Sequence, residues 1–208
     1  MPPIELQPES LLDELLAYSR KLQAGAEQLC SADEITAGVT PREVIYREDK
    51  LTLYRYLPDT DAAALNPVPL LIVYALVNRP YMADLQEDRS TIKGLLASGQ
   101  PVYLIDWGYP DSADRFLTLD DYVNGYLDRC VDRLRERHGV ERINLLGICQ
   151  GGAMSLCYTA LHQPKVRNLV TMVTPVDCHT PDNMLSAWAQ HLVVDLLVDV
   201  TGSIPGDC

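Results

Sequence analysis

The sequence predicts an α/β protein built on a mostly parallel β-sheet. Segments typical of buried strands alternate along the chain with segments of helical periodicity, which is the order found in a parallel sheet with right-handed crossovers. Residues 67–76, PVPLLIVYAL, are apolar almost throughout, as a strand covered on both faces is. The composition, 47% apolar and 22% charged residues in a chain of 208, is that of a globular domain.

The segment at 8–29 is predicted to be an amphipathic helix. Its apolar residues recur at spacings of three, four and seven, which places them on one helical face. They are Leu11, Leu15, Tyr18, Leu22 and Leu29. Such a face packs either on the protein's own domain or on a partner subunit, and the pattern alone does not choose between the two.

The rest of the chain alternates between strands and helices. Two short strands meet at a turn near Asp49. Thr118 followed by Asp121 indicates the start of a helix that ends at Gly139. The predicted strands are 43–48, 50–57, 67–76, 101–106, 142–148 and 166–173, and the other predicted helices are 89–97, 152–162 and 181–200.

Charge and hydropathy exclude several classes of protein. The formal net charge is −12 and no cluster of Lys and Arg is present, whereas a nucleic-acid-binding protein needs a basic surface for the phosphates. No apolar run approaches the ~20 residues that span a bilayer. The N-terminus, MPPIELQPES, has neither the basic nor the apolar region of a secretory signal. We therefore expect a cytoplasmic protein with no transmembrane segment and no nucleic-acid partner.

The cysteines show no metal-binding spacing. No C-x-x-C pair occurs, and no Cys/His group has the spacing of zinc ligands. We therefore expect no metal. Most of the cysteines are expected to be free thiols, and Cys130 and Cys157 to be packing residues on helices.

Cys149 differs from the other cysteines in its context. The strand INLLGI leads directly into Gly147-Ile148-Cys149-Gln150-Gly151, and a helix follows. This is the context of a nucleophile elbow, with Cys where hydrolases usually have Ser. The residues two before and two after the nucleophile must be very small in such a turn, as Gly147 and Gly151 are. The strand before Cys149 is also the fifth, as in the α/β-hydrolase architecture; the alternative is a buried thiol with glycines for packing.

Two backbone amides are candidates for an oxyanion hole. The N–H of Gln150, at the start of the helix, points to where an oxyanion would form, and the helix N-terminus favours a thiolate on Cys149. In this architecture the second donor comes from the loop after the third strand, and the N–H of Val77 is the candidate. An ordinary surface loop is the alternative for Val77.

A cysteine at the elbow favours acyl transfer over hydrolysis. A thiolate that takes an acyl group from a thioester forms another thioester, so the exchange is nearly balanced in energy. The acyl group stays reactive enough for a hydroxyl to attack next. The sequence therefore suggests transfer from a coenzyme A thioester to a hydroxyl.

Three segments resemble class III poly(3-hydroxyalkanoate) synthases. They are LLIVYALVNRPYMADLQEDRSTIKGLLASGQPVYLIDWGYP, NLLGICQGGAMSLCY and VRNLVTMVTPVD. The resemblance implies an α/β-hydrolase fold and an acyltransferase that polymerises 3-hydroxyacyl-CoA into a storage polyester. It implies that Cys149 is the acylated residue, that Val77 and Gln150 supply the oxyanion donors, and that no cofactor is needed, since coenzyme A is part of the substrate.

The same resemblance implies the partners and the location. Class III synthases work with an accessory subunit, so a homo- or hetero-oligomer is expected. They act at the surface of polyester granules in the cytoplasm.

The resemblance also indicates that the chain is an N-terminal fragment. It divides the chain into an N-terminal helix and lead-in at 1–36, an incomplete core at 37–178 whose sheet stops after its sixth strand, and the start of a lid at 179–208. The catalytic Asp and His of the family follow the seventh and eighth strands, so we expect neither in this chain and little turnover from it. A sheet that stops there exposes an edge strand, and we expect the chain to self-associate or to be poorly soluble.

The histidines of this chain and the acids near its strand ends are expected to have structural roles. His138 and His162 close helices, and His179 and His191 lie in the predicted lid-entry segment. Asp106 ends the fourth predicted strand, and a loop-organising hydrogen bond is expected for it. Asp177 lies just past the sixth, and the resemblance implies a structural role for it.

Two other functions are compatible with the sequence. One is a Cys-dependent thioesterase or dienelactone-type hydrolase of the same fold. The other is a non-catalytic, truncated homologue that binds the accessory subunit or the granule surface through residues 8–29 and the lid-entry helix.

Overall fold

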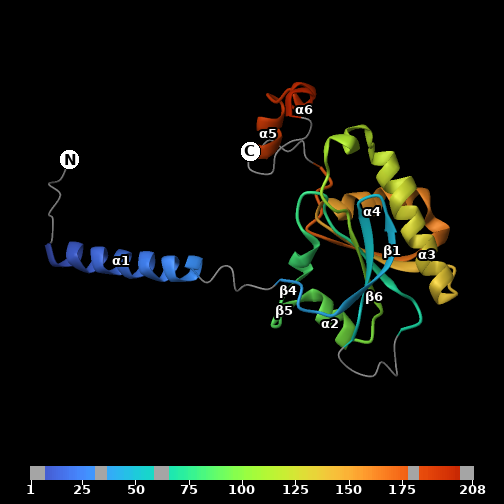
Figure 1. Cartoon of the computed structure of the whole chain (residues 1–208), viewed down its shortest axis with the longest axis horizontal. Coiled ribbons are helices and arrows are strands. Elements are labelled where there is room, and N and C mark those ends of the chain that lie inside the picture. The colour runs from blue at the N-terminus through green and yellow to red at the C-terminus, as the bar shows by residue number, and fades with distance from the viewer. Residues whose placement is uncertain (1–7, 31–36, 59–65, 178–182, 202–208) are drawn as a thin grey trace. The chain divides into compact units, whose positions relative to one another are not determined.

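The computed structural model describes most of the chain as two compact units. The described residues are 8–30, 37–58, 66–177 and 183–201. The units are Met1–Ala37 and Gly38–Cys208. The first unit contains helix α1, Pro8–Cys30, which confirms the predicted N-terminal helix (Figure 1). The apolar side chains of Leu15, Tyr18 and Leu22 are exposed on this helix. The division into three regions stays a prediction.

The second unit is built on a six-stranded sheet (Figure 1). Its strands run in the order β1-β2-β6-β3-β7-β8, and β6, β3, β7 and β8 are parallel to one another while β1 and β2 form an antiparallel edge. The strands are β1 Arg42–Glu48, β2 Leu51–Tyr56, β3 Leu70–Val73, β6 Val102–Asp106, β7 Ile143–Ile148 and β8 Val166–Met172. The predicted α/β class with a mostly parallel sheet is confirmed, and β7 is the fifth strand of this sheet along the chain.

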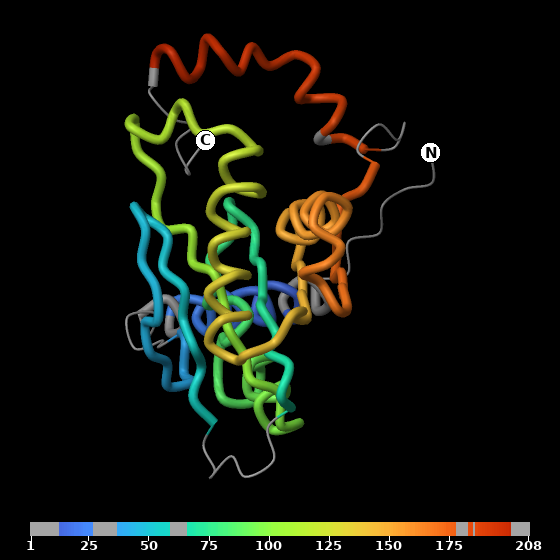
Figure 2. Tube along the Cα trace, turned by 90° about the vertical axis from the view of Figure 1, so that its right-hand side faces the viewer, coloured from blue at the N-terminus to red at the C-terminus, as the bar shows by residue number. Residues whose placement is uncertain are grey.

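Helices cover both faces of the sheet. Helices α3, Asp128–His138, and α4, Gln150–Leu161, share one apolar cluster with side chains of one face of the sheet. Helix α2, Thr91–Ala97, packs in a second cluster with the opposite face. In Figure 2 the cyan and green strands lie beside the yellow α3 and the orange α4. Burial on both faces explains why β3, with all four residues buried, reads as a continuous apolar run.

Several small elements were not predicted. A two-stranded hairpin, β4 Asp84–Gln86 and β5 Arg89–Ser90, precedes α2, so the helix predicted from residue 89 begins two residues later. Short 3₁₀ helices occur at Pro80–Ala83, Ser112–Phe116 and Gln163–Lys165.

Two predicted helices differ in form from the expectation. The helix after Thr118 contains a π-helical stretch, Asp121–Leu127, before it continues as α3. Its start is capped as predicted, because Thr118 N–H donates to Asp121 Oδ2 at 2.7 Å and Asp121 N–H donates to Thr118 Oγ1 at 3.3 Å. The helix predicted at 181–200 is interrupted. The structure has α5 Met184–Ala189 and α6 Val194–Thr201 there.

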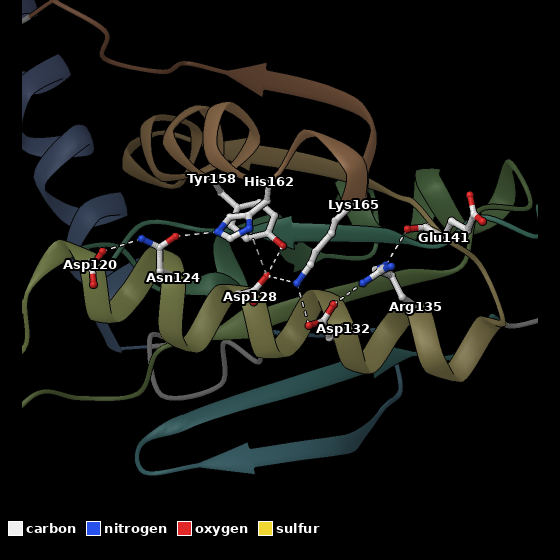
Figure 3. A network of polar contacts seen from close by, with 9 residues as sticks. All are labelled: Asp120, Asn124, Asp128, Asp132, Arg135, Glu141, Tyr158, His162 and Lys165. Atoms are coloured by element: carbon white, nitrogen blue, oxygen red, sulfur yellow. Dashed lines mark hydrogen bonds and ion pairs between the residues drawn. The ribbon is translucent and has the colours of Figure 1, made fainter.

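A polar network holds the far end of α4 against α3 (Figure 3). Asp128 Oδ1 accepts hydrogen bonds from Tyr158 Oη and Lys165 Nζ, each at 2.7 Å, and Lys165 Nζ also reaches Asp132 Oδ2 at 2.9 Å. His162 stacks on the ring of Tyr158 with centroids 4.5 Å apart. Burial raises the pKa of Asp128, but the hydrogen bonds from Lys165 and Tyr158 lower it by more, so its carboxylate is favoured. The network holds the helix that follows Cys149 against α3.

Candidate active site

Cys149 stands between β7 and α4 in a strained backbone conformation. Its φ is 55° and its ψ is −126°, which non-glycine residues rarely adopt. Its N–H donates to the carbonyl oxygen of Met172 in β8 at 2.9 Å, and its own carbonyl accepts from Gly152 N–H at 2.9 Å. The thiol is partly exposed. This is the backbone geometry of a nucleophile elbow, and the catalytic role of Cys149 stays a prediction.

The glycines around Cys149 allow α4 to approach the sheet closely. A Cβ on Gly151 would lie 2.1 Å from the carbonyl oxygen of Val73 in β3, and a Cβ on Gly147 would lie 2.5 Å from the Cα of Gly152. Both contacts are with backbone atoms, which cannot rotate away as a side chain can. The requirement for Gly147 and Gly151 therefore has a direct steric cause in this structure.

Gln150 links the elbow to the loop after β3. Its side-chain Oε1 accepts a hydrogen bond from the N–H of Leu76 at 3.1 Å. Val77, the next residue, is 82% exposed, and its N–H donates no hydrogen bond to another described residue. As the first residue of α4, Gln150 has no acceptor for its own N–H in a preceding helical turn. The two predicted oxyanion donors thus belong to segments that the Gln150 side chain ties together.

The loop after β3 is also tied to the loop after β6. Trp107 Nε1 donates to the carbonyl oxygen of Tyr74 at 3.0 Å. Arg79 Nη1 donates to the carbonyl oxygen of Gly108 at 2.9 Å, and its guanidinium stacks 3.2 Å from the ring centroid of Tyr109. Asp106 Oδ1 accepts from Gly108 N–H at 3.0 Å, which confirms the predicted loop-organising role of Asp106. These contacts restrict the segment that carries Val77.

Tyr74 is the buried titratable neighbour of Cys149. Burial raises the pKa of the Tyr74 hydroxyl, and negative charge on the Cys149 sulfur raises it further. The tyrosine is therefore neutral at physiological pH, so it adds no charge that would oppose a thiolate. Among the residues that the structure describes, no three His, Cys, Asp or Glu side chains gather in a metal-binding arrangement.

The histidines that close helices are structural, as expected. His138 Nε2 lies 2.7 Å from the hydroxyl of Tyr103, and burial lowers the pKa of His138. His162 Nε2 lies 2.7 Å from Asn124 Oδ1 and follows α4, roughly 20 Å along the helix axis from Cys149.

The remaining residues singled out in the sequence differ in their exposure to solvent. His191 and Asp177 are exposed, and His179 lies outside the described residues. Cys130 is fully buried, and burial raises its pKa to about 12, which confirms a packing role. The prediction for Cys157 is wrong. Its side chain is exposed, because α4 turns this position away from the sheet.

The fold and the elbow define the class of protein. The chain belongs to the α/β-hydrolase fold family, whose model matches residues 68–197. A narrower match covers the preceding part of the chain, since residues 9–95 match the model of the poly-beta-hydroxybutyrate polymerase (PhaC) N-terminus.

Curated relatives carry the name of the same polymerase. The poly(3-hydroxyalkanoate) polymerase subunit PhaC of Allochromatium vinosum is 68% identical over 205 residues, and that of Thiocystis violacea is 64% identical over 208. The alignments cover 99% and 100% of this chain. The predicted resemblance to poly(3-hydroxyalkanoate) synthases is confirmed. The chain spans 58% of the length of each of these relatives.

Solved structures support the fold alone. The Francisella virulence factor BioJ matches with a TM-score of 0.52 at 15% identity, covering 77% of this chain and 52% of that one. A lipase-class structure from Sulfolobus solfataricus matches with a TM-score of 0.51 at 16% identity, covering 78% and 57%. None of the helices in the described part of the chain has the length and apolar character to cross a membrane.

Proposed function

We propose that the protein acts in poly(3-hydroxyalkanoate) synthesis as an acyltransferase with Cys149 as its nucleophile. The observation that carries the proposal is a cysteine in a strained elbow at the start of α4, in a chain whose relatives are named as this polymerase subunit. The Cys149 thiolate attacks the carbonyl of a 3-hydroxyacyl-CoA, the carbon–sulfur bond to coenzyme A breaks, and coenzyme A leaves as a thiolate that takes up a proton. The acyl group is then a thioester of Cys149.

Chain growth follows from the same thioester. The hydroxyl of another hydroxyacyl group attacks the carbonyl, loses its proton to a base and releases the Cys149 thiolate, so one ester bond forms and one thioester bond breaks. The N–H groups of Val77 and Gln150 stabilise the negative oxygen that develops in both steps. We place the base and its acidic partner outside this chain, because the resemblance puts the catalytic Asp and His after a seventh and an eighth strand, and the sheet of the described residues has six.

The remaining features of the proposal come from the family resemblance. No cofactor is required, because coenzyme A enters with the substrate. The partners are 3-hydroxyacyl-CoA, the polyester and an accessory subunit in a homo- or hetero-oligomer. The site of action is the granule surface in the cytoplasm.

The test follows acylation of one cysteine. The full-length protein, which includes the base and acid that we place outside this chain, is incubated with 3-hydroxybutyryl-CoA, and the peptide that contains Cys149 is analysed by mass spectrometry for a hydroxybutyryl adduct. We expect the adduct on wild-type protein and on the matched control Cys157→Ala, which alters an exposed cysteine of the same helix, and its absence from Cys149→Ala.

The products separate the alternatives. Polymer, or oligomers of 3-hydroxybutyrate, supports the proposal. Free hydroxy acid as the main product would identify a thioesterase instead. No adduct on Cys149 in a folded sample would favour the non-catalytic homologue, and the exchange of Leu15 and Leu22 to Asp would then be expected to abolish binding of the accessory subunit.

A further inference from the structure

A cavity of ≈ 160 Å³ lies beside the loop after β3. Its wall comes from four segments that are far apart in the sequence: the turn between β1 and β2, the loops after β3 and β6, and the π-helix. Asp49, Lys50, Leu76, Trp107 and Tyr122 are part of this wall. None of these residues has a role in the acyl transfer described above.

The cavity shares structural elements with the candidate active site. Leu76 lines the cavity, and its backbone N–H donates to the side chain of Gln150. Trp107 lines it too, and its indole N–H donates to Tyr74. Trp107 follows β6 and Cys149 follows β7, with β3 between them, so two strand spacings, roughly 10 Å, separate the two positions along the sheet edge. A flexible substrate attached to Cys149 must span this distance to enter the cavity.

The charged side chains of the wall and the Tyr126 hydroxyl already take part in hydrogen bonds and ion pairs. Tyr126 Oη donates to Asp49 Oδ2 at 2.6 Å, and Lys50 Nζ pairs with Asp111 at 2.7 Å and with Asp114. The rings of Trp107 and Tyr122 meet edge to face with centroids 5.4 Å apart, so neither forms an open cage for a cation. The surface that is left for a ligand is mainly apolar.

The charge balance argues against an anionic ligand. Two aspartates, Asp49 and Asp114, line the cavity and only one lysine does. The positive charge of Lys50 is balanced by the carboxylates of Asp111 and Asp114. These carboxylates also raise the pKa of Lys50, so the lysine stays protonated. An added carboxylate or phosphate would meet net negative charge with no cation left to pair with it.

The volume fits a ligand of about six heavy atoms. An apolar cavity of about 150 Å³ in another protein takes up benzene, which sets the scale. We propose that this cavity binds one neutral ester unit of the growing polyester, a unit next to the one bonded to Cys149. The proposal rests on the proposed function, since it assigns a place to that function's product.

Binding of a small ester tests the proposal without turnover. Methyl 3-hydroxybutyrate is titrated into the protein, and the carbon-13 methyl signals of its leucines are followed by NMR. We expect shifts of the Leu76 and Leu117 signals, because both side chains line the cavity. The charged 3-hydroxybutyrate should bind at least fivefold more weakly than its neutral ester.

A pair of matched variants locates the site. Leu117→Trp fills the cavity and should weaken ester binding at least tenfold, whereas Leu119→Trp, which makes the same exchange two residues away at an exposed position outside the wall, should leave it unchanged. If Leu117→Trp fails to fold, the signal shifts of the wild-type protein still decide where the ester binds.

Three results would overturn the proposal: shifts only at leucines away from the cavity, equal affinity for ester and carboxylate, or tighter binding of tetramethylammonium than of the ester. A failed acylation test together with ester binding in the cavity would count against the proposed function and not against the cavity as an ester site. Acylation of Cys149 without ester binding in the cavity would support the proposed function and count against the cavity as an ester site.

Discussion

Replacing Gly151 with alanine should disrupt the junction of α4 and the sheet. The added Cβ would lie 2.1 Å from the carbonyl oxygen of Val73 and 2.7 Å from that of Tyr74, whereas real Cβ atoms essentially never approach a neighbour within 3.0 Å. The helix start or β3 must therefore move by about 0.9 Å. Strand β3 is hydrogen-bonded to β6 on one side and β7 on the other, so it cannot move without breaking its ladders.

The cost of this overlap can be estimated. Overpacking of a well-packed interior costs about 1–3 kcal/mol, and a clash with backbone atoms of two consecutive residues belongs at the upper end, at about 3 kcal/mol. For a domain of this size such a loss lowers the melting temperature by about 6–12 °C. We expect this fall in thermal unfolding followed by circular dichroism.

A second glycine provides the control. Gly94 lies inside α2 and is exposed, and a Cβ added to it would have no other atom within 4 Å, so Gly94→Ala should stabilise by about 0.8–1 kcal/mol through helix propensity alone. Its melting temperature should rise by about 2–4 °C. If Gly151→Ala unfolds within about 2 °C of the wild type, the steric account of the elbow is wrong.

Four further expectations follow from other contacts. Asp128→Asn should cost about 1 kcal/mol of unfolding free energy at pH 7. The difference should begin to shrink as the pH falls below about 4, the ordinary pKa of an aspartate, and should vanish only at a pH below the lowered pKa of Asp128, where the folded carboxyl is protonated too; urea unfolding at pH 7 and at a series of acidic pH values measures it. Gln150→Ala should slow acylation of Cys149 about tenfold while Gln163→Ala does not, as measured by mass spectrometry over time; equal rates would remove the positioning role of this side chain. Iodoacetamide should label Cys157 in the native protein but reach Cys130 only in denaturant, and peptide mapping would contradict the burial of Cys130 if both were labelled alike. The exposed side chains of Val170, Met172 and Val173 at the edge strand should make the chain self-associate, and Val170→Lys should reduce the oligomer seen in gel filtration; a wild-type monomer would refute this.

The sheet and the elbow could be predicted because their signals are local. Strand β3 is buried on both faces, so every one of its side chains is apolar and the run is visible in sequence. The elbow depends on Gly147 and Gly151, because a side chain at either position would clash with backbone atoms. Glycines at these two positions can be read directly from the sequence.

Features that depend on distant contacts could not be predicted. The hydrogen bond between Gln150 and Leu76 joins residues 74 positions apart and leaves no periodic pattern. The exposure of Cys157 depends on which side of α4 faces the sheet, and the low amphipathicity of this helix hides that side. The π-helix at Asp121–Leu127 differs from an α-helix only in its hydrogen-bond spacing, which residue types do not report.

The two ends of α4 are held by different means, and this has a consequence for motion. The first turn sits against β3 through glycine contacts, and the last turn is fastened through Tyr158 and the Asp128 carboxylate. Amide hydrogens of this helix should therefore exchange with solvent only when the whole unit unfolds. The loops after β3 and β6 are held by a few side-chain bonds, so their amides should exchange by small local openings. In the acyl transfer that we propose, these loops would then adapt to acyl groups of different size, while the Cys149 thiol keeps its position.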